Sequence, residues 1–248
     1  MRRRFFVDRF DNGTAMVLGA SAAHLGRVLR AERGQLYELS DGERVWLARV
    51  AWVKPEAVEF ALVERVDSPE IARSSSLEIT LMLSIVKFDR MEWCLEKATE
   101  LGATRIVIMA SERSEKNLIR AAAKRAERWK KILRESAQQS RRLVPPFLAP
   151  CEKAAAAFSN SEAELRLMCS EMRGATPIRE IFELPKPVKH VALAFGPEGG
   201  WTDEEIAGAA DAGFQQAGLG SYILRTETAV IAALAIVRYA LGGAGMVP

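Results

Sequence analysis

The stretch VALAFGPEGGWTDEE, residues 191–205, decides the fold. Its first five residues are apolar and of strand length, and a glycine-rich turn follows them directly at residues 196–200. Thr202 then predicts the start of a helix, because Glu205 stands three residues later and completes a capping box. A buried strand, a tight turn and a capped helix in succession indicate one unit of a parallel α/β sheet.

The same alternation of strands and helices extends from residue 77 to the end of the chain. Gly102 is placed to end the first helix, and the pair Pro145-Pro146 follows the second. The pattern predicts a parallel sheet covered by helices on both faces. The expected strands are residues 77–86, 105–109, 164–168, 191–195 and, more weakly, 214–219, and the expected helices are residues 91–101, 117–139 and 226–241.

The first 70 residues have a different pattern, with short β-rich segments at residues 45–50 and 57–63 between turn signals. A short helix is expected at residues 21–28, with Ser21 as its N-cap and Leu25, Val28 and Leu29 on its apolar side. The polar stretch at residues 67–76 is typical of a linker. The sequence therefore predicts a small β-barrel domain at residues 1–72 and an α/β domain at residues 73–248.

Charge is distributed unevenly in this chain of 248 residues, although its formal net charge is only +3. Residues 112–142 contain eleven lysines and arginines against four acidic residues. Such a basic helix is typical of contact with a phosphate backbone, and equally of an ordinary solvated helix face.

Several classes of protein are disfavoured by the composition. Three cysteines and two histidines without CxxC spacing disfavour a disulfide framework and a Cys/His zinc site. The longest apolar run, residues 229–237, is less than half of the ~20 residues that span a bilayer. Asp8 follows the short apolar start too closely for a secretory signal. A cytoplasmic protein without membrane or metal partners is expected.

A second loop of the same kind as residues 196–200 lies at residues 219–228, again between a strand and a helix. Because ligands of open parallel sheets bind at the carboxyl ends of the strands, two such loops at adjacent strand ends favour a nucleotide-like ligand. The dinucleotide fingerprint GxGxxG and the phosphate loop GxxxxGK[ST] are absent from the sequence. A redox dinucleotide and ATP are therefore disfavoured as ligands.

These two loops resemble the second and third cofactor loops of the knotted SPOUT methyltransferases. Within that class, almost the whole chain is similar to the 16S ribosomal RNA uracil-N3 methyltransferase family. Ser140 precedes two arginines where the family commonly has Gly or Cys before one, so Arg141 and Arg142 both stay candidates for the family's arginine. The residues that carry the resemblance, besides the two loops, are Lys87, Arg90-Met91-Glu92, residues 97–102, 111–114 and 127–131, and Gln138-Gln139-Ser140-Arg141.

The resemblance implies a PUA-like RNA-binding barrel, a SPOUT α/β domain with a C-terminal trefoil knot, and a homodimer. It implies S-adenosylmethionine as the cofactor and N3 of a specific uridine in 16S rRNA (the uracil-1498 type of site) as the methyl acceptor, in the assembled small ribosomal subunit. The implied cofactor-binding residues are Met168, Ser170, Phe195, Gly196, Pro197, Glu198, Gly199, Gly200, Leu219, Gly220, Ile223, Leu224, Arg225, Thr228 and Ala229.

Two catalytic candidates follow from this chemistry. Arg225 would stabilise negative charge on the uracil oxygens, although an ion pair with Glu227 is the alternative. Glu198 would act as a base or would order its loop. The RNA-binding candidates are Arg2, Arg3, Arg4, Arg90, Arg113, Lys116, Arg128, Arg141 and Arg142.

Several residues are expected to have structural roles only, and two rival functions stay open. Trp93 and Trp129 are expected in the core, and Glu92, Glu96 and Glu100 are expected to be solvated or paired charges rather than metal ligands. The rivals are a knotted methyltransferase acting on ribose 2′-oxygens and a non-catalytic RNA-binding protein of ribosome assembly. Binding of S-adenosylhomocysteine would exclude the second rival.

Overall fold

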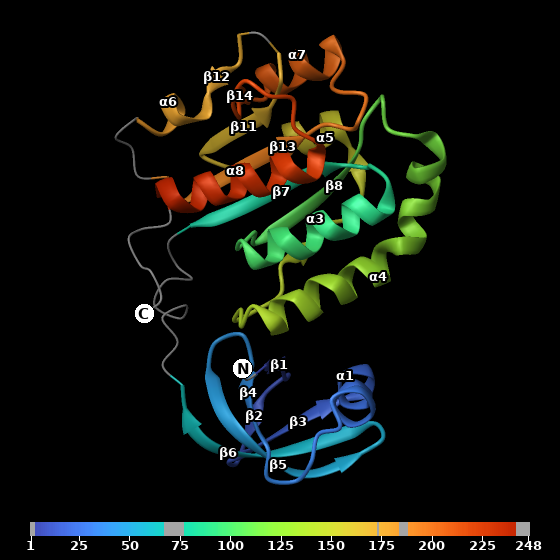
Figure 1. Ribbon diagram of the computed structural model, residues 1–248, viewed down its shortest axis with the longest axis vertical. Coiled ribbons are helices and arrows are strands. Elements are labelled where there is room, and N and C mark those ends of the chain that lie inside the picture. Colours follow the sequence, from blue (N-terminus) through green and yellow to red (C-terminus); the bar gives the residue numbers. More distant parts are fainter. Residues whose placement is uncertain (1–2, 67–76, 173, 184–187, 242–248) are drawn as a thin grey trace. The chain divides into compact units, whose positions relative to one another are not determined.

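The computed structural model describes residues 3–66, 77–172, 174–183 and 188–241, and the chain forms two compact units (Figure 1). The first unit comprises Met1–Ser75 together with Ala137–Pro145, and the second comprises Ser76–Ser136 and Pro146–Pro248. The predicted linker, residues 67–76, lies outside the described residues. The domain boundary after residue 72 stays a prediction, and the distant segment 137–145 is an addition to the first unit that the sequence pattern does not indicate.

A curled mixed sheet forms the first unit, with the strand order β1-β4-β5-β6-β3-β2. β1 pairs parallel with β4 and the other pairs are antiparallel. Phe5, Leu39 and Phe60 are fully buried inside the curl. Among the described residues no pairing joins β1 to β2, so the expected barrel is a half-barrel. The strands are β1 Arg4–Phe6, β2 Phe10–Asp11, β3 Thr14–Leu18, β4 Leu36–Ser40, β5 Val45–Lys54 and β6 Ala57–Arg65.

The short helix of this unit begins earlier than expected. α1 covers Gly19–Ala23 and continues into a π-helical turn, η1, at His24–Val28. Ser21 is wrong as the N-cap, because that position is Leu18, which makes no side-chain capping bond. Leu25 is buried as expected, whereas Val28 is 65% exposed, since the wider π-turn rotates it out of the apolar face.

A parallel sheet forms the centre of the second unit, in the order β10-β8-β7-β13-β11-β14-β12, with β9 also paired to β8. All of its strand pairs are parallel, which confirms the predicted SPOUT-type α/β class. The strands are β7 Glu78–Ser84, β8 Arg105–Ala110, β9 Phe147–Leu148, β10 Glu152–Lys153, β11 Leu165–Cys169, β12 Thr176–Pro177, β13 His190–Phe195 and β14 Gln215–Gly218.

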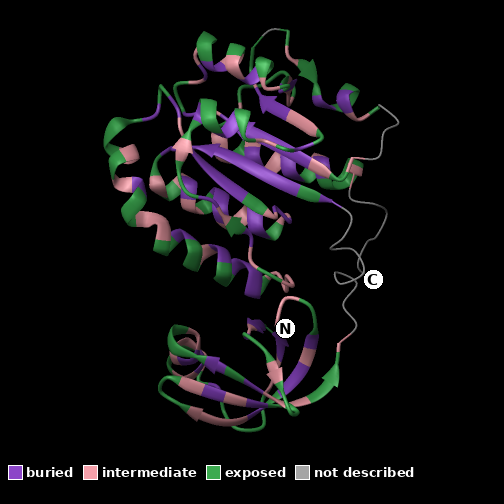
Figure 2. Cartoon of the chain, turned by 180° about the vertical axis from the view of Figure 1, so that it is seen from behind, coloured by how far each residue is buried: buried purple, intermediate pink, exposed green. Residues whose placement is uncertain are grey.

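Helices cover both faces of this sheet, because its strands alternate their side chains between two cores. In β13, Val191 and Leu193 join the core beneath α3, α4 and α8, and Ala192 and Ala194 join the core beneath α5 and α7. Figure 2 shows the central strands as the most continuously buried part of the unit. The helices are α3 Phe88–Glu100, α4 Lys116–Gln139, α5 Ala154–Ser159, α6 Ile178–Phe182, α7 Asp203–Asp211 and α8 Thr226–Leu241.

Local signals in this unit are confirmed with one exception. Gly102 follows α3 with a φ of +87°, and Trp129 is 2% exposed. Trp93 is wrong as a core residue, since 43% of it is exposed on the outer side of α3. In the part of the chain that the structure describes, no helix is long and apolar enough to cross a membrane.

Candidate functional site

A cavity of about 610 Å³ lies at the carboxyl edge of the parallel sheet. Its walls are the segments that follow β11, β13 and β14, together with parts of α3, α7 and α8. The expectation that the two glycine-rich loops follow adjacent strands is wrong, because β11 lies between β13 and β14. The segment after β11 therefore forms a third wall. The volume is within the ~300–1000 Å³ typical of small-molecule sites.

The loop after β13, residues 196–200, leaves little room for side chains at two of its glycines. A Cβ on Gly196 would approach the Trp201 ring to 3.1 Å, and one on Gly199 would approach the Cβ of Arg113 to 3.2 Å. Gly200 has a φ of +71°, which favours glycine. Trp201 is mostly buried, and its Nε1 donates to the carbonyl oxygen of Cys169 at 3.3 Å. The loop is therefore a shaped, packed turn that exposes its backbone to the cavity.

Arg113, in the segment between β8 and α4, secures this loop from outside. Its Nη1 donates to the carbonyl oxygens of Gly199 at 3.1 Å and Trp201 at 2.9 Å. The Glu205 carboxylate completes the link, since it accepts from the backbone N–H of Glu112 at 3.0 Å and of Thr202 at 3.0 Å. Thr202 Oγ1 in turn accepts from the N–H of Glu205 at 3.2 Å, so the predicted capping box is confirmed.

The loop after β14, residues 219–225, forms the opposite wall. Gly220 has a φ of +127°, and Tyr222 and Ile223 are 85% and 80% exposed. Arg225 also lines the cavity, and it makes no ion pair with any described residue. The alternative pairing of Arg225 with Glu227 is therefore wrong, and Arg225 is an exposed residue of the cavity lining.

Arg90, near the start of α3, is the arginine that pairs with Glu227, and it also pairs with Glu198. Its Nη1 donates to Oε1 of Glu198, and its Nε lies 4.0 Å from Oε1 of Glu227. Glu198 belongs to the loop after β13, and Glu227 is the second residue of α8. One guanidinium thus joins both sides of the cavity that it also lines.

Cys169, at the end of β11, places a thiol at the wall of the cavity. Burial raises the pKa of this thiol to about 12. The group therefore stays protonated across the physiological pH range and supplies an apolar surface rather than a thiolate nucleophile.

Most residues predicted to bind the cofactor are gathered around this cavity. Two are not: Met168 is 1% exposed in the core beneath α5 and α7, and Thr228 is exposed on the first turn of α8. Met168 points away because side chains alternate along β11, so its neighbours Cys169 and Ser170 reach the edge. The predicted residues that line the cavity are Ser170, Phe195, Gly196, Pro197, Glu198, Gly199, Gly200, Leu219, Gly220, Ile223, Leu224, Arg225 and Ala229.

Part of the cavity wall consists of residues that were not predicted from the sequence. Position at the end of β11 is the signal that would have found Cys169, Glu171 and Met172, and position in the capped turn would have found Trp201. The remaining missed residues of the lining are Asp203, Ile206, Tyr222 and Thr226, and Arg90 and Arg113 line it although they were assigned to RNA.

The predicted RNA-binding arginines and lysine do not form one group. Arg2 lies outside the described residues, whereas Arg3 and Lys116 are exposed. Arg128, on α4, donates from Nε and Nη2 to the two carboxylate oxygens of Glu92 at 2.7 Å each. This confirms Glu92 as a paired charge, and in the described residues no cluster of metal-ligating side chains is present.

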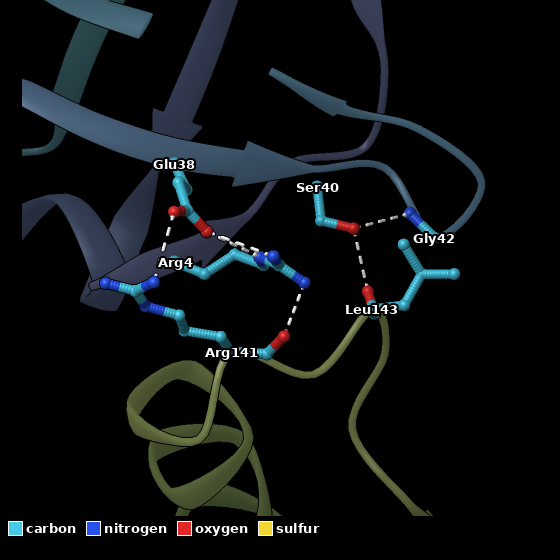
Figure 3. A network of polar contacts seen from close by, with 6 residues as sticks. All are labelled: Arg4, Glu38, Ser40, Gly42, Arg141 and Leu143. Atoms are coloured by element: carbon cyan, nitrogen blue, oxygen red, sulfur yellow. Dashed lines mark hydrogen bonds and ion pairs between the residues drawn. The ribbon is translucent and has the colours of Figure 1, made fainter. Parts of the chain in front are cut away.

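Arg4 has an internal role instead of the expected exposed one (Figure 3). It is 3% exposed, and its Nε and Nη2 donate to Oε2 of Glu38 at 3.1 and 3.0 Å. Its Nη1 donates to the carbonyl oxygen of Arg141, whose own Nη1 lies 3.7 Å from Oε1 of Glu38. The guanidinium of Arg4 is therefore buried within the first unit, and its assignment to an RNA surface is withdrawn. Arg142 is half-buried and follows directly.

The chain is similar in sequence to RNA methyltransferases from several bacteria. The family model described as "RNA methyltransferase domain" matches residues 73–238. The ribosomal RNA small subunit methyltransferase E of Synechocystis sp. is 31% identical over 236 residues, which cover 92% of this chain and 74% of that protein. The protein of the same name from Bacillus subtilis is 28% identical, over 91% of this chain and 90% of its own length.

Solved structures agree with these relatives in fold. The ribosomal RNA small subunit methyltransferase E of Neisseria gonorrhoeae, bound to S-adenosyl methionine, has a TM-score of 0.84 and 31% identity, covering 96% of this chain and 98% of that one. A Legionella pneumophila protein with the bound cofactor SAM has a TM-score of 0.85 and 29% identity, covering 97% and 98%. This chain therefore belongs to the ribosomal RNA small subunit methyltransferase E family.

Proposed function

We propose that this protein transfers a methyl group from S-adenosylmethionine to N3 of a uridine in the 16S rRNA of the small ribosomal subunit. The observation that carries the proposal is the cavity at the carboxyl edge, walled by both glycine-containing loops and the end of β11. It is supported by similarity over almost the whole chain to methyltransferases of small-subunit rRNA and to structures with bound S-adenosyl methionine.

The cavity suits a nucleoside-like cofactor. Side chains at Gly196 or Gly199 would crowd Trp201 or Arg113, so the space beside these turns depends on glycine. Phe195, Leu219 and Ile223 add apolar wall for an adenine ring. The cofactor supplies an electrophilic methyl group on its sulfonium sulfur. The protein's task is to hold that methyl in line with N3 of the bound base.

Methylation of N3 requires that the nitrogen lose its proton, which ends in solvent or on a base while the N–CH₃ bond forms and the S–CH₃ bond breaks. The charge that develops spreads onto the two uracil carbonyl oxygens. Arg225 is the residue that would meet this charge, because it lines the cavity and makes no ion pair with any described residue. Its guanidinium would stabilise the anionic base before methyl transfer.

Glu198 is a weaker candidate for the general base than the sequence alone indicated. Oε1 of its carboxylate accepts a hydrogen bond from Arg90, and the positive charge of this guanidinium makes the carboxylate a weaker base. This geometry favours the other role considered for it, that of ordering the loop after β13.

The substrate base must be unpaired or flipped out, because N3 lies on its Watson–Crick edge. Lys116 and the exposed arginines of α4 are the proposed contacts to the RNA backbone, together with Arg3 in the first unit. The proposal includes a homodimer, as the family resemblance implies, and an assembled small subunit as the substrate.

Nucleoside mass spectrometry tests this function. Small subunits that lack the modification are incubated with the protein and isotope-labelled S-adenosylmethionine, and the 16S rRNA is digested. Label in 3-methyluridine is expected. Label in a 2′-O-methylated nucleoside would move the protein to the ribose-methylating rival, and no label would leave the RNA-binding rival.

A further inference from the structure

The side chain of Arg90 makes polar contacts both with a residue of the loop after β13 and with a residue of the helix that follows the loop after β14. Its Nη1 donates to Glu198, and its Nε is 4.0 Å from the carboxylate of Glu227. We infer that Arg90 is a positioning residue: by bridging these two carboxylates it sets the separation of the two cofactor loops and hence the affinity for the cofactor. The inference rests on the proposed function.

The bridge is anchored on a rigid element. Met91, Cys94 and Leu95, on the inner side of α3, are completely buried in the core beneath the sheet. α3 also packs directly against α8. The loop after β14 is less packed, since Tyr222 and Ile223 are 85% and 80% exposed. A guanidinium carried by the well-packed α3 therefore helps to set where this loop lies relative to the loop after β13.

Partial burial makes the bridge stronger than an ordinary surface ion pair. The side chains of Arg90, Glu198 and Glu227 are 31%, 34% and 16% exposed. Water screens such groups less than fully exposed ones, so their charges interact more strongly. Two carboxylates share this one cation, and its removal would leave them in mutual repulsion across the cavity wall.

Glu227 depends on Arg90 in particular. Its Oε2 is buried without a hydrogen-bond partner, and among the described residues Arg90 is its sole paired cation. The charge of Glu227 also acts on the interior: after burial, it is the second cause that raises the pKa of Cys94 to about 12. The carboxylate therefore needs a compensating cation to keep α8 and its preceding loop in place.

The test measures cofactor affinity without RNA. S-adenosylhomocysteine is titrated by calorimetry into the wild type, Arg90→Ala, Glu198→Gln and the double variant. Arg90→Ala is expected to raise the dissociation constant about tenfold, within the range for residues of one ion-pair network. The double variant is expected to be no weaker than Arg90→Ala alone, because both changes break the same contact.

Lys97→Ala is the matched control. Lys97 lies two turns further along α3, is 29% exposed, and also bridges two carboxylates, those of Glu96 at 2.7 Å and Glu100 at 3.0 Å. It does not line the cavity, so its removal should leave the dissociation constant unchanged. Arg90→Lys keeps the charge without the planar guanidinium, so its dissociation constant should lie between those of the wild type and Arg90→Ala. This variant replaces Arg90→Ala in the comparison if Arg90→Ala proves less thermally stable.

Three results would overturn the inference: cofactor affinity unchanged in Arg90→Ala, an equal loss in Lys97→Ala, or additive losses in the double variant. An unchanged cofactor constant with weaker, less salt-dependent RNA binding would return Arg90 to the RNA surface, because the variant would have lost a phosphate contact. Failure of the wild type to bind S-adenosylhomocysteine would instead contradict the proposed function.

Discussion

Arg225 stands out among the three arginines that line the cavity, because its side chain makes neither a hydrogen bond nor an ion pair within the part of the chain that the structure describes. Arg90 and Arg113, by comparison, donate to groups of the loop after β13. A cation held at a cavity wall without an ionic partner is suited to meet charge that appears during a reaction. We therefore propose that Arg225 takes part in the chemical step and that the other two arginines maintain the shape of the site.

Replacing Arg225 separates these roles. Arg225→Ala is expected to lower the turnover number for methyl transfer by about 100-fold, the scale for loss of one preorganised charge-stabilising group. The dissociation constant for S-adenosylhomocysteine should change by no more than about threefold, because the charge matters chiefly in the transition state. Single-turnover kinetics and calorimetry measure the two quantities. A loss confined to cofactor affinity would show that Arg225 binds the cofactor instead.

Residue-level prediction from the sequence succeeded for the loops and failed for ionic partners. The glycine-rich turns could be placed at the cavity because glycine, proline and strand ends are local signals. The pairing of Arg4 with Glu38, or of Arg90 with Glu198, joins residues 34 and 108 positions apart. Charge in a sequence does not indicate which partner the fold brings to it.

At the scale of the element, α7 shows how a helix start can stabilise a site. Glu205 is 9% exposed and serves two segments, since it caps α7 through Thr202 and accepts from the N–H of Glu112 before α4. The first turn of the helix thereby fixes the segment that carries Arg113, which secures the cofactor loop.

The two members of this cap should differ in their contribution to stability. Thr202→Ala is expected to lower the free energy of unfolding by about 1 kcal/mol, the usual effect of losing a side-chain cap. Glu205→Ala should lower it by about 2–3 kcal/mol, because two backbone N–H groups lose a charged acceptor. Urea denaturation measures both. An equal or smaller effect for Glu205→Ala would mean that its link to Glu112 contributes nothing.

Elements with strong local signals were predicted well. The strands around residues 77–86 and 191–195 and the helix at residues 226–241 are close to β7, β13 and α8, because apolar runs and caps set them locally. The predicted start of α1 was wrong. Serine is a common N-cap residue, but the helix begins at Gly19, directly after β3 ends at Leu18. The two-residue strands β9, β10 and β12 are defined by their pairing with neighbouring strands, so no local sequence pattern predicts them.

At the scale of the whole molecule, the chain returns to its first unit in the last turn of α4. Arg4 and Glu38 meet the carbonyl oxygen and side chain of Arg141, and Ser40 Oγ donates to the carbonyl oxygen of Leu143 at 2.7 Å (Figure 3). Arg141 has a φ of +56°, so the chain turns sharply where it makes these contacts. The segment 137–145 is thereby part of the first unit.

Removing the carboxylate of Glu38 tests whether this network holds the segment 137–145 in the first unit. Glu38→Ala would remove the carboxylate that accepts two hydrogen bonds from the buried guanidinium of Arg4, and we expect a loss of about 3–5 kcal/mol of stability. Amide hydrogen exchange should also accelerate in residues 137–145. Glu43→Ala, an exposed neighbour in sequence, should change stability by no more than about 0.5 kcal/mol. Equal effects of the two variants would show that the network is not stabilising.

The order of the strands is the feature of the whole molecule that was hardest to predict from the sequence. The pattern predicted a parallel sheet, and it could not show that β11 separates β13 from β14. Long-range pairing depends on the path of the entire chain, whereas periodicity reports only the faces of each strand. The third wall of the cavity, with Cys169 and Met172, was therefore missed.

The most direct test of the account is a calorimetric titration of S-adenosylhomocysteine into the wild type and into Gly199→Leu. The leucine side chain would begin 3.2 Å from the Cβ of Arg113 and would deform the loop that walls the cavity. We expect saturable binding with one site per chain in the wild type and no measurable binding in a variant that remains folded. Absence of binding in the wild type, or equal binding in the two proteins, would contradict the assignment of this cavity as the cofactor site.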